Sequence, residues 1–461
     1  MSFTFLENKR FESRVPQEDV SLAEIVFGYL IGPSLAYLLI TALAGNYLIQ
    51  FYTDVLGVSG TLISIMPFIA KIFAAFTNIL IGKLIDKTSS TQGKARPWIF
   101  VSGLALSISG ILLYAVPKAS LSLQLIWIVF SYNLFFAGAN NVYLLSHTLM
   151  LPRSTRNSKK RDTLSLLKNV SESMIPGTLS AVIMPVLVKS FGVGRLAQSK
   201  WFSFMLAISV LAIPGCLLEY YFTRERVDVE KKEEVYSFKK QFADCLHYKP
   251  WVYVITLFVI KTIDSHIFNA TVIYFCNWVL SNSVAEGSTR QVLFNVLGQF
   301  PLGPGLFLLM PILKKHDKKK VMTIGFALSA LASVFVFMNA HDFKLVLAGT
   351  FVKSIGGIAT FLSVSLLSDV LDGFERKFNY RCDTFSITCT TLIALLGSGV
   401  AQSLLLFGIN TYGYVAPQSA AEVIVQNEAI RTFFNFTMNG IPVIGYAISV
   451  ILLIKLSKTS S

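Results

Sequence analysis

Long apolar segments constrain this chain more than any other feature. Between short charged or turn-rich stretches, runs long enough to cross a bilayer recur along its length. A helix needs roughly 20 residues to cross the hydrocarbon core, because each residue adds about 1.5 Å and lipid offers the backbone no hydrogen-bond partner. With 53% hydrophobic and 14% charged residues, a water-soluble fold could not cover these segments. The chain is therefore predicted to be an all-α integral membrane protein.

About twelve spans are predicted, and this even number returns both termini to one side of the membrane. The spans lie near residues 27–52, 58–82, 98–117, 122–150, 164–190, 201–222, 251–281, 291–313, 321–340, 344–368, 384–410 and 432–455. Most of the 40 Lys and Arg residues fall in loops that are cytoplasmic if both termini are inside. We therefore expect cytoplasmic termini in a cell membrane, plasma or inner. The polar stretch through Val20 predicts that no cleavable signal peptide precedes the first span.

The net charge of +14 follows from this topology. Basic loops hold the chain's orientation and attract anionic lipid, so they do not indicate a nucleic-acid surface. The partners predicted are the lipid bilayer and a small-molecule substrate, with no nucleic acid and no partner protein.

A polar stretch at 223–249 divides the spans six and six. Within it, apolar residues recur at helical spacing and predict a short amphipathic helix on the inner membrane surface: Phe238, Phe242, Cys245 and Leu246. The predicted organisation is an N-terminal six-helix half at 1–222, this cytoplasmic linker, and a C-terminal six-helix half at 250–461. Two six-span halves around a midplane cavity are typical of transporters.

Motifs for other kinds of chemistry are missing from the sequence. The five cysteines lack metal-ligand spacing and are expected to be free thiols. No Gly-rich phosphate loop with its lysine is present, which argues against transport driven by ATP. No His/Glu metal motif or nucleophile elbow is found. The chain is therefore predicted not to be an enzyme and to bind neither a cofactor nor a metal.

Several short motifs occur in a fixed order along the chain. They are Phe51-Tyr-Thr-Asp-Val-Leu-Gly57, Gly82-Lys-Leu-Ile-Asp-Lys-Thr88, Gly93-Lys-Ala-Arg-Pro-Trp98, Arg161-Asp-Thr-Leu164, Thr223-Arg-Glu-Arg-Val227, Ser368-Asp-Val-Leu-Asp372 and Tyr380-Arg-Cys-Asp383. Together they resemble the glycoside-pentoside-hexuronide:cation symporters, the sugar branch of the major facilitator superfamily. The resemblance implies the major facilitator fold, with about twelve transmembrane helices in two six-helix halves, and sugar transport.

Charged residues in these motifs are candidates for a gate. They can pair across the cytoplasmic ends of helices and hold the inward gate shut until the halves rock. The gating candidates are Asp86, Lys83, Arg96, Asp369 and Arg381. The alternative is that these charges only set the topology and form local ion pairs.

The coupling-cation site of the family is altered here. The resemblance implies a basic residue and two aspartates on one face of span two, at positions occupied by Lys71, Ala74 and Asn78. Sodium needs several oxygen ligands, and anionic ones dominate its affinity. The lysine that the family carries on span eleven is replaced by Leu395. An unpaired charge near the midplane is costly, so loss of the aspartates favours loss of this lysine. A family-type sodium site is therefore not expected.

Sugar recognition in the family uses an amide or acidic residue on span four and an arginine early in span five. Here Asn140-Asn-Val-Tyr143 keeps the amide and an aromatic ring, and Lys168 stands at the arginine position. The family's span-one acid has no counterpart in Gly32-Pro33-Ser34. The predicted substrate-binding residues are Lys71, Asn78, Asn140, Tyr143 and Lys168.

Ionisable residues also appear within spans where the resemblance implies none. Glu172 lies four residues after Lys168, a spacing at which side chains meet on one helix face, and Asp264 lies three after Lys261. Intramembrane carboxylates and imidazoles can carry protons. The candidates for proton coupling are Glu172, Asp264 and Lys261, with His147, His266 and Lys353 as further ionisable candidates. Neutral, hydrogen-bonded packing is the alternative for each.

Three functional hypotheses remain open at this stage. The leading one is a secondary active or facilitative transporter of a small solute, a sugar or glycoside, that works by alternating access without Na⁺ coupling. The second is a carrier or exporter of an anionic or amphipathic, lipid-like solute, for which Lys71 and Lys168 would be natural partners. The third is a membrane sensor or scaffold that binds its ligand without moving it.

Overall fold

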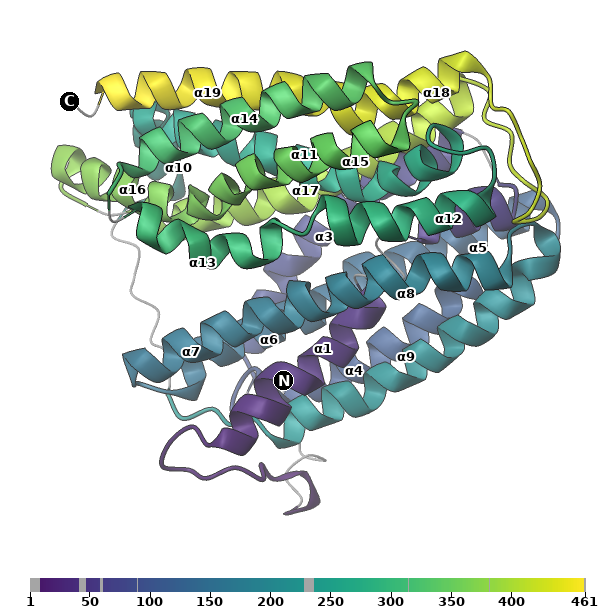
Figure 1. Cartoon of the computed structure of the whole chain (residues 1–461). Helices are drawn as coiled ribbons and strands as arrows, with labels where there is room; N and C mark the ends of the chain where they lie inside the picture. Colours follow the sequence, from purple (N-terminus) through teal and green to yellow (C-terminus); the bar gives the residue numbers. More distant parts are fainter. Residues whose placement is uncertain are drawn as a thin grey trace. The chain divides into compact units, whose positions relative to one another are not determined.

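The computed structural model describes residues 9–40, 47–58, 61–88, 90–227, 236–313, 315–380 and 382–459. All regular secondary structure within these ranges is helical (Figure 1). The chain forms two compact units, Met1–Lys232 and Glu233–Ser461. Each unit is a helical bundle and is described by itself.

The described residues of the first unit form long helical runs, several of which include a wide π turn. Its elements are η2 (Lys9–Phe11), η3 (Glu24–Ile31), α1 (Gly32–Tyr37), α2 (Leu48–Gln50), η5 (Phe51–Val55), α3 (Thr61–Asp86), α4 (Arg96–Tyr114), α5 (Leu121–Asn133), η6 (Leu134–Ala139), α6 (Asn140–Ser154), α7 (Ser158–Asn169), η7 (Val170–Met174), α8 (Ile175–Phe191), η8 (Arg195–Ala197) and α9 (Gln198–Tyr221). The π turns η6 and η7 join α5 to α6 and α7 to α8. Such turns change which face of a helix a side chain occupies and often mark functional sites.

The second unit begins with the helix of the linker. Its elements are α10 (Phe238–His247), α11 (Lys249–Trp278), α12 (Val284–Leu293), η9 (Phe294–Gly298), α13 (Leu302–Leu313), α14 (Lys318–Met338), α15 (Phe343–Gly357), η10 (Ile358–Leu362), α16 (Ser363–Phe378), α17 (Asp383–Thr411), α18 (Glu428–Asn435), η11 (Phe436–Gly440) and α19 (Ile441–Thr459). In Figure 1, α14 and α19 run side by side, and α19 also packs against the long helix α11.

Ten helical segments in the described part of the chain are long and apolar enough to cross a membrane. Each overlaps one predicted span, which confirms the all-α membrane fold. The other two predicted spans, 27–52 and 291–313, are not among these ten segments. Span 27–52 includes residues 41–46, which lie outside the described ranges, and span 291–313 is interrupted by a turn at 299–301, where Pro301 cannot donate a backbone hydrogen bond.

Small residues bring helices of the same unit into close contact. A Cβ on Gly103 of α4 would lie 2.4 Å from the Cβ of Cys216 on α9. In the second unit, a Cβ on Gly356 of α15 would lie 2.4 Å from the carbonyl oxygen of Gly325 on α14. Lipid is as apolar as a leucine side chain, so such close van der Waals packing drives association in a membrane.

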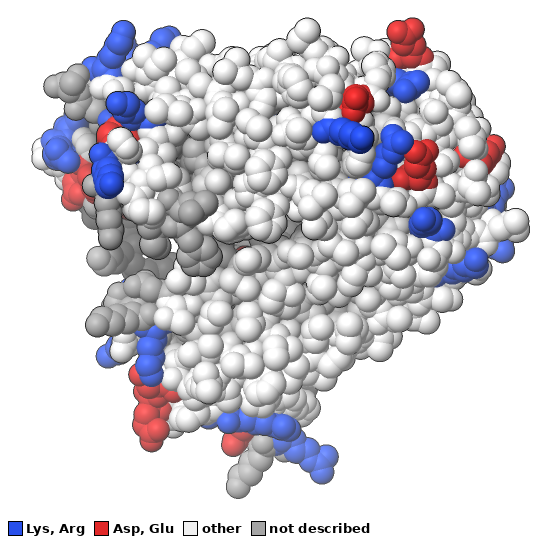
Figure 2. Space-filling view, viewed as in Figure 1, with Lys and Arg blue, Asp and Glu red and all other residues white. Residues whose placement is uncertain are grey.

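The outer surface is apolar along the middle of the helices. On the face shown in Figure 2, charged side chains gather toward the helix ends, and uncharged side chains occupy the surface between them. Exposed side chains on α14 include Ile324, Leu331 and Met338, each at least 61% exposed. A surface of this kind is stable only against lipid or another apolar partner.

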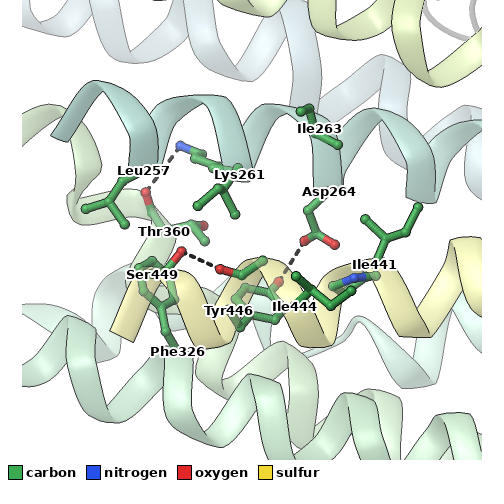
Figure 3. Close-up of a pocket in the computed structure, with 13 residues that line it drawn as sticks. Leu257, Lys261, Ile263, Asp264, Phe326, Thr360, Ile441, Ile444, Tyr446 and Ser449 are labelled. Carbon is green, nitrogen blue, oxygen red and sulfur yellow. Dashed lines mark hydrogen bonds between the residues drawn. The ribbon is translucent and has the colours of Figure 1, made fainter. Parts of the chain in front are cut away.

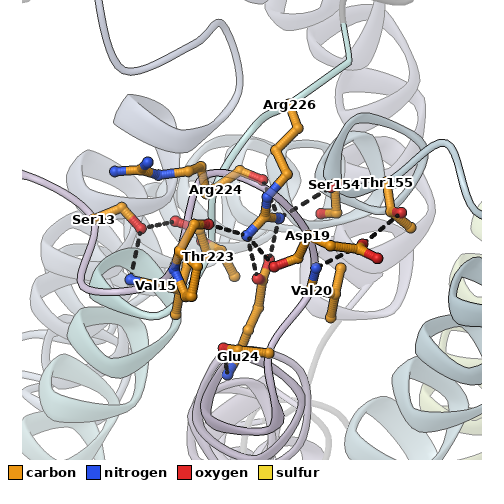
Figure 4. Close-up of polar contacts among 12 residues, drawn as sticks. Ser13, Val15, Asp19, Val20, Glu24, Ser154, Thr155, Thr223, Arg224 and Arg226 are labelled. Atoms are coloured by element: carbon orange, nitrogen blue, oxygen red, sulfur yellow. Dashed lines mark hydrogen bonds and ion pairs between the residues drawn. The ribbon is translucent and has the colours of Figure 1, made fainter.

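A buried ion pair fixes the start of the first unit (Figure 4). Arg226 donates to both carboxylate oxygens of Glu24, at 2.7 and 3.1 Å, and Glu24 is 0% exposed. The same guanidinium donates to the carbonyl oxygens of Pro16 at 2.7 Å and Ser154 at 3.0 Å. The motif at 223–227 therefore joins the N-terminal segment, η3 and the end of α6. We call Arg226, Glu24 and these carbonyls the Arg226 anchor.

An exposed pair lies beside the Arg226 anchor. The Lys160 ammonium is 2.8 Å from the carboxylate of Asp19. This hydrogen bond lowers the pKa of Asp19 below its ordinary value, because it stabilises the ionised carboxylate. The side chains of Lys160 and Asp19 are 40% and 41% exposed, so solvent screens the interaction between them.

Glu225 caps the N-terminus of α4 from a distant part of the chain. Its carboxylate accepts hydrogen bonds from the backbone N–H groups of Lys94 at 3.0 Å, Ala95 at 2.6 Å and Arg96 at 2.9 Å. These donors have no partner within the helix, and a carboxylate also stabilises the positive end of the helix dipole. The loop at 93–96 is therefore held against the end of α9.

We expect Glu225→Ala to destabilise the first unit. Three backbone donors lose a charged acceptor, and hydrogen bonds of this type contribute about 1.5–3 kcal/mol each before water replaces part of them. The expected loss is about 1.5–3 kcal/mol in the free energy of unfolding, measured by denaturant titration of the purified protein in detergent. Glu18→Ala, at an exposed position, is the control. Equal unfolding midpoints for the two variants would contradict the capping role.

Candidate functional site

The two positions on α3 at which the family carries aspartates hold neutral residues in this chain, Ala74 and Asn78. Ala74 is 0% exposed, and its carbonyl oxygen accepts a hydrogen bond from the Asn141 amide nitrogen at 2.8 Å. That amide also lies 2.9 Å from Thr77 Oγ1, which donates to the carbonyl oxygen of Ala137 at 2.6 Å. Neutral amide and hydroxyl groups thus bridge α3 to η6 and α6.

Lys71 is the charged residue on this face. It is 7% exposed, and its Nζ lies 4.4 Å from the centroid of the Phe136 ring. Among the described residues, no carboxylate lies within ion-pair distance of it. A cation–π contact compensates for only part of the cost of burying an ammonium group. Lys71 is therefore a buried cation that can still take an anionic or polar partner.

The two amides predicted to bind substrate differ in their surroundings. Asn140 is 6% exposed, and its Oδ1 is buried without a hydrogen-bond partner within the described ranges. Asn78 is half-buried on α3. A buried polar atom without a partner is uncommon and needs an explanation, such as a bound molecule.

Glu219 of α9 is the most deeply buried carboxylate of a larger network. Tyr143 Oη donates to Glu219 Oε2 at 2.7 Å, and His147 Nδ1 lies 2.6 Å from Glu219 Oε1. The side chains of Glu219 and His147 are 1% and 0% exposed. Tyr143 and His147 lie one turn apart on α6, so both face α9.

A second carboxylate lies on the other side of the same imidazole. Glu172 of η7 accepts a hydrogen bond from Tyr37 Oη at 2.7 Å and is 3.1 Å from Lys168 Nζ. His147 Nε2 lies 3.4 Å from the same Glu172 oxygen. The predicted contact between Lys168 and Glu172 is thus present. We call Tyr37, Tyr143, His147, Lys168, Glu172 and Glu219 the His147 network.

The charges of the His147 network suit a group that takes up and releases a proton. A neutral imidazole has one N–H and can donate to only one carboxylate, whereas a protonated imidazole donates to both. With Lys168 charged and both glutamates ionised, the network carries one excess negative charge when His147 is neutral. Protonation of His147 would neutralise this excess negative charge.

Sequence reasoning missed two members of this network. Glu219 lies near the end of a predicted span, and an acidic residue in an apolar segment was the available indication of its role. Tyr37 gives no such indication, because a tyrosine in a membrane helix is ordinary. Only the packing of α1 against η7 brings its hydroxyl to Glu172.

Lys261 and Asp264 line a cavity in the second unit (Figure 3). The cavity has a volume of about 180 Å³ and lies among α11, α14, η10 and α19. Asp264 Oδ2 accepts a hydrogen bond from Tyr446 Oη at 2.7 Å, and Lys261 Nζ donates to the carbonyl oxygen of Thr360 at 3.2 Å. Lys261 and Asp264, which were predicted to contact each other, form no ion pair with each other among the described residues. Instead, each side chain pairs with another helix.

Lys353 and His266, the other ionisable candidates in the second unit, lie on α15 and α11. Lys353 of α15 has its Nζ 6.0 Å from the Tyr446 ring centroid, and His266 lies half-buried on α11. For metals, the described residues contain no group of three or more His, Cys, Asp or Glu side chains placed to hold an ion.

The gating candidates occupy different environments. Arg96 is 2% exposed and donates to the carbonyl oxygens of Tyr220 at 2.8 Å and Phe11 at 3.0 Å. Asp369 forms an ion pair with Lys318 at 2.7 Å. Lys83 is exposed at the end of α3. The side chain of Asp86 and the whole of Arg381 lie outside the described part of the chain, and gating by any of these residues stays a prediction.

The sequence matches one protein family and aligns with known relatives over most of its length. Residues 28–458 match the sequence model of the MFS/sugar transport protein family. The isoprimeverose transporter of Lactiplantibacillus pentosus is 24% identical over 426 residues, which cover 90% of this chain and 84% of the relative. The glucuronide carrier protein homolog of Escherichia coli (strain K12) is 21% identical over 433 residues, covering 92% and 91%.

Solved structures agree on the fold. A bacterial homolog of the human lysosomal transporter Spinster, in an inward-facing and unoccupied conformation, has a TM-score of 0.63 at 13% identity. The match covers 95% of this chain and 96% of that chain. At this identity the likeness concerns the fold alone.

Proposed function

Because this chain belongs to the MFS/sugar transport protein family, we propose that it carries a sugar or glycoside across its membrane by alternating access and couples this movement to protons. The chain is a multi-pass membrane transporter of a small molecule and not an enzyme. The isoprimeverose transporter and the glucuronide carrier homolog are both named for saccharides, which supports a saccharide substrate. We place the protein in a cell membrane with both termini cytoplasmic, as the distribution of basic residues predicts.

The His147 network is the observation that supports proton coupling. It holds two carboxylates and an imidazole within one unit, with Glu219 and His147 almost fully buried. A site of this kind can take up a proton in one conformation and release it in another, provided that the two conformations differ in proton affinity. Glu172 is the member that also contacts Lys168, a predicted substrate-binding residue. Substrate arriving at Lys168 would therefore change the charge around Glu172.

The absence of carboxylates at positions 74 and 78 of α3 supports independence from sodium. The carbonyl oxygen of Ala74 accepts a hydrogen bond from the Asn141 amide, and the side chains at positions 74 and 78 offer no carboxylate oxygen. The coordination of Na⁺ depends on several oxygens with negative charge among them. Lys71 on the same face adds positive charge, which opposes a cation further. We therefore propose that Lys71, Asn78 and Asn140 bind substrate rather than sodium.

The proposed coupling is tested with the purified protein in proteoliposomes. We expect isoprimeverose to accumulate under an inward proton gradient and to do so equally with Na⁺ or K⁺ as the only alkali cation. Addition of isoprimeverose should also make the outside solution more alkaline. Uptake that requires Na⁺ and is indifferent to the proton gradient would overturn the proposal. Tight binding without any counterflow would favour a sensor or scaffold.

A second candidate function is transport of an anionic solute, and the isolated ammonium of Lys71 favours it. An acidic saccharide would supply the carboxylate that this cation lacks within the described ranges. Competition separates the two candidates. A glucuronide that displaces isoprimeverose, and loses this ability in Lys71→Gln, would identify the acidic substrate. Displacement by neutral sugars alone would identify the neutral one.

A further inference from the structure

Two cysteines from distant parts of the second unit meet at the linker helix α10. Cys245 lies on α10, and Cys382 directly precedes α17, 137 residues later in the chain. The Cys245 thiol donates a hydrogen bond to Cys382 Sγ at 3.5 Å. Both thiols are free and buried. The sulfurs of a disulfide lie about 2.05 Å apart, so these two need to approach by only about 1.5 Å to form one.

Contacts on both sides of Cys382 hold the two thiols facing each other. Before it in the chain, Tyr380 Oη donates to the carboxylate of Asp244, the neighbour of Cys245, at 2.8 Å. After it, the Phe385 ring packs edge to face on Phe238 at the start of α10, with ring centroids 5.1 Å apart. The meeting of the two thiols therefore follows from how α10 packs against the start of α17.

The surroundings of Cys382 favour its thiolate form. Its Sγ accepts the hydrogen bond from Cys245 and lies 3.7 Å from Ser386 Oγ. Trp251 Nε1 donates to the same Ser386 oxygen at 2.8 Å, so this hydroxyl can direct its own hydrogen to the sulfur. The hydrogen bond from Cys245 lowers the pKa of Cys382 below its ordinary value, because it stabilises the ionised sulfur. The thiolate is the form that attacks oxidants.

The helix that covers the pair is short. α10 has ten residues, which is too few for a stable helix by itself, so its packing against the second unit holds it in place. Its outer face is exposed and includes Phe238, Phe242 and Leu246. A short peripheral element of this kind opens locally more readily than the core does, and a small oxidant can then enter. Cytoplasmic thiols are normally reduced, and the disulfides that form there are mostly transient or redox-sensing.

We propose that Cys245 and Cys382 are a redox modification site, at which a peroxide converts the dithiol to a disulfide that clamps α10 to the start of α17. The Cys382 thiolate attacks one oxygen of hydrogen peroxide, the O–O bond breaks, and hydroxide leaves, so that Cys382 becomes a sulfenic acid. The Cys245 sulfur then attacks the Cys382 sulfur, the S–O bond breaks, and water leaves with the proton of Cys245. Both thiols are thereby oxidised, and the peroxide is reduced to water. A dithiol reductant reverses the change.

Peptide mapping of the full-length protein tests the bond. The purified protein in lipid nanodiscs is treated with hydrogen peroxide, digested without reduction and analysed by mass spectrometry. We expect a peptide pair linked through Cys245 and Cys382 that disappears on treatment with dithiothreitol. Cys245→Ala and Cys382→Ala should each lack it. Cys389→Ser removes a half-buried thiol on α17, and this matched control should form the disulfide as wild type does.

Hydrogen exchange of the same samples tests the clamp. The α10 amides of wild type should exchange about tenfold more slowly after peroxide treatment, and those of both alanine variants should not change. Thermal unfolding shows whether each variant is folded, and either one is sufficient. Absence of the linked pair, a bond that forms through Cys389 instead, or unchanged α10 exchange in the linked protein would each overturn the proposal. Neither readout involves transport, so the result is independent of the proposed substrate and coupling.

Discussion

Glu172→Gln is expected to abolish the proton-driven accumulation of solute. A gradient of one pH unit supplies about 1.4 kcal/mol per proton, enough for about tenfold accumulation when one proton moves with each solute. The amide cannot take up a proton, and it leaves Lys168 and His147 without the carboxylate that both contact. The accumulation ratio in proteoliposomes should therefore fall from about ten to about one.

A separate measurement distinguishes lost coupling from lost transport. Exchange of labelled for unlabelled isoprimeverose at equal pH needs no net proton movement, so it should fall less than accumulation does. Glu18→Gln, at an exposed position of the N-terminal segment, is the control and should accumulate solute like wild type. If Glu172→Gln still accumulates isoprimeverose tenfold, the proton is carried elsewhere.

His147→Gln tests the same network from its centre and removes the group that lies between Glu172 and Glu219. The two glutamates can then no longer share a proton through the imidazole, so accumulation should fall as in Glu172→Gln. An unchanged accumulation ratio in this variant would restrict the proton site to Glu172.

The membrane helices were predictable because their cause is local. Each membrane helix must form its backbone hydrogen bonds within itself, because lipid offers no partner. A run of apolar residues is therefore enough to identify it. Span 291–313 differs from its prediction. Its composition is predominantly apolar, but Pro301 and the turn before it break the helix. The average composition of a segment does not show that one residue, a proline, lacks a backbone N–H donor.

The candidate site was predictable only where its contacts lie on one helix. Lys168 and Glu172 are four residues apart, and this spacing alone predicted their ion pair. Glu219 meets His147 and Tyr143 across two helices, and those contacts depend on how α6 packs against α9. For Lys261 and Asp264, the contact predicted from spacing is absent. Their spacing suggested a pair, but Thr360 and Tyr446 on neighbouring elements hold them apart.

Arg226→Met is expected to cause the largest loss of stability among single changes in the first unit. Breaking a buried ion pair by removing one partner costs about 3–5 kcal/mol, because the remaining charge is left buried and unpaired. Here Glu24, at 0% exposure, would lose both of its hydrogen bonds from the guanidinium. The carbonyl oxygens of Pro16 and Ser154 would lose their donor as well. The free energy of unfolding, measured by denaturant titration in detergent, should fall by about 3–5 kcal/mol.

Two further variants separate the ion pair from simple loss of a long side chain. In Glu24→Gln combined with Arg226→Met, no charge remains unpaired, so the double variant should be more stable than the sum of the two single losses predicts. Lys160→Gln breaks the exposed pair with Asp19 beside the same anchor, and solvent screening should make its effect far smaller. If Arg226→Met unfolds at the same denaturant concentration as Lys160→Gln, the Arg226 anchor does not stabilise the unit. A lower midpoint for Arg226→Met alone, partly restored by Glu24→Gln, would identify the buried pair as the link that holds η3 against α6 and the segment after α9.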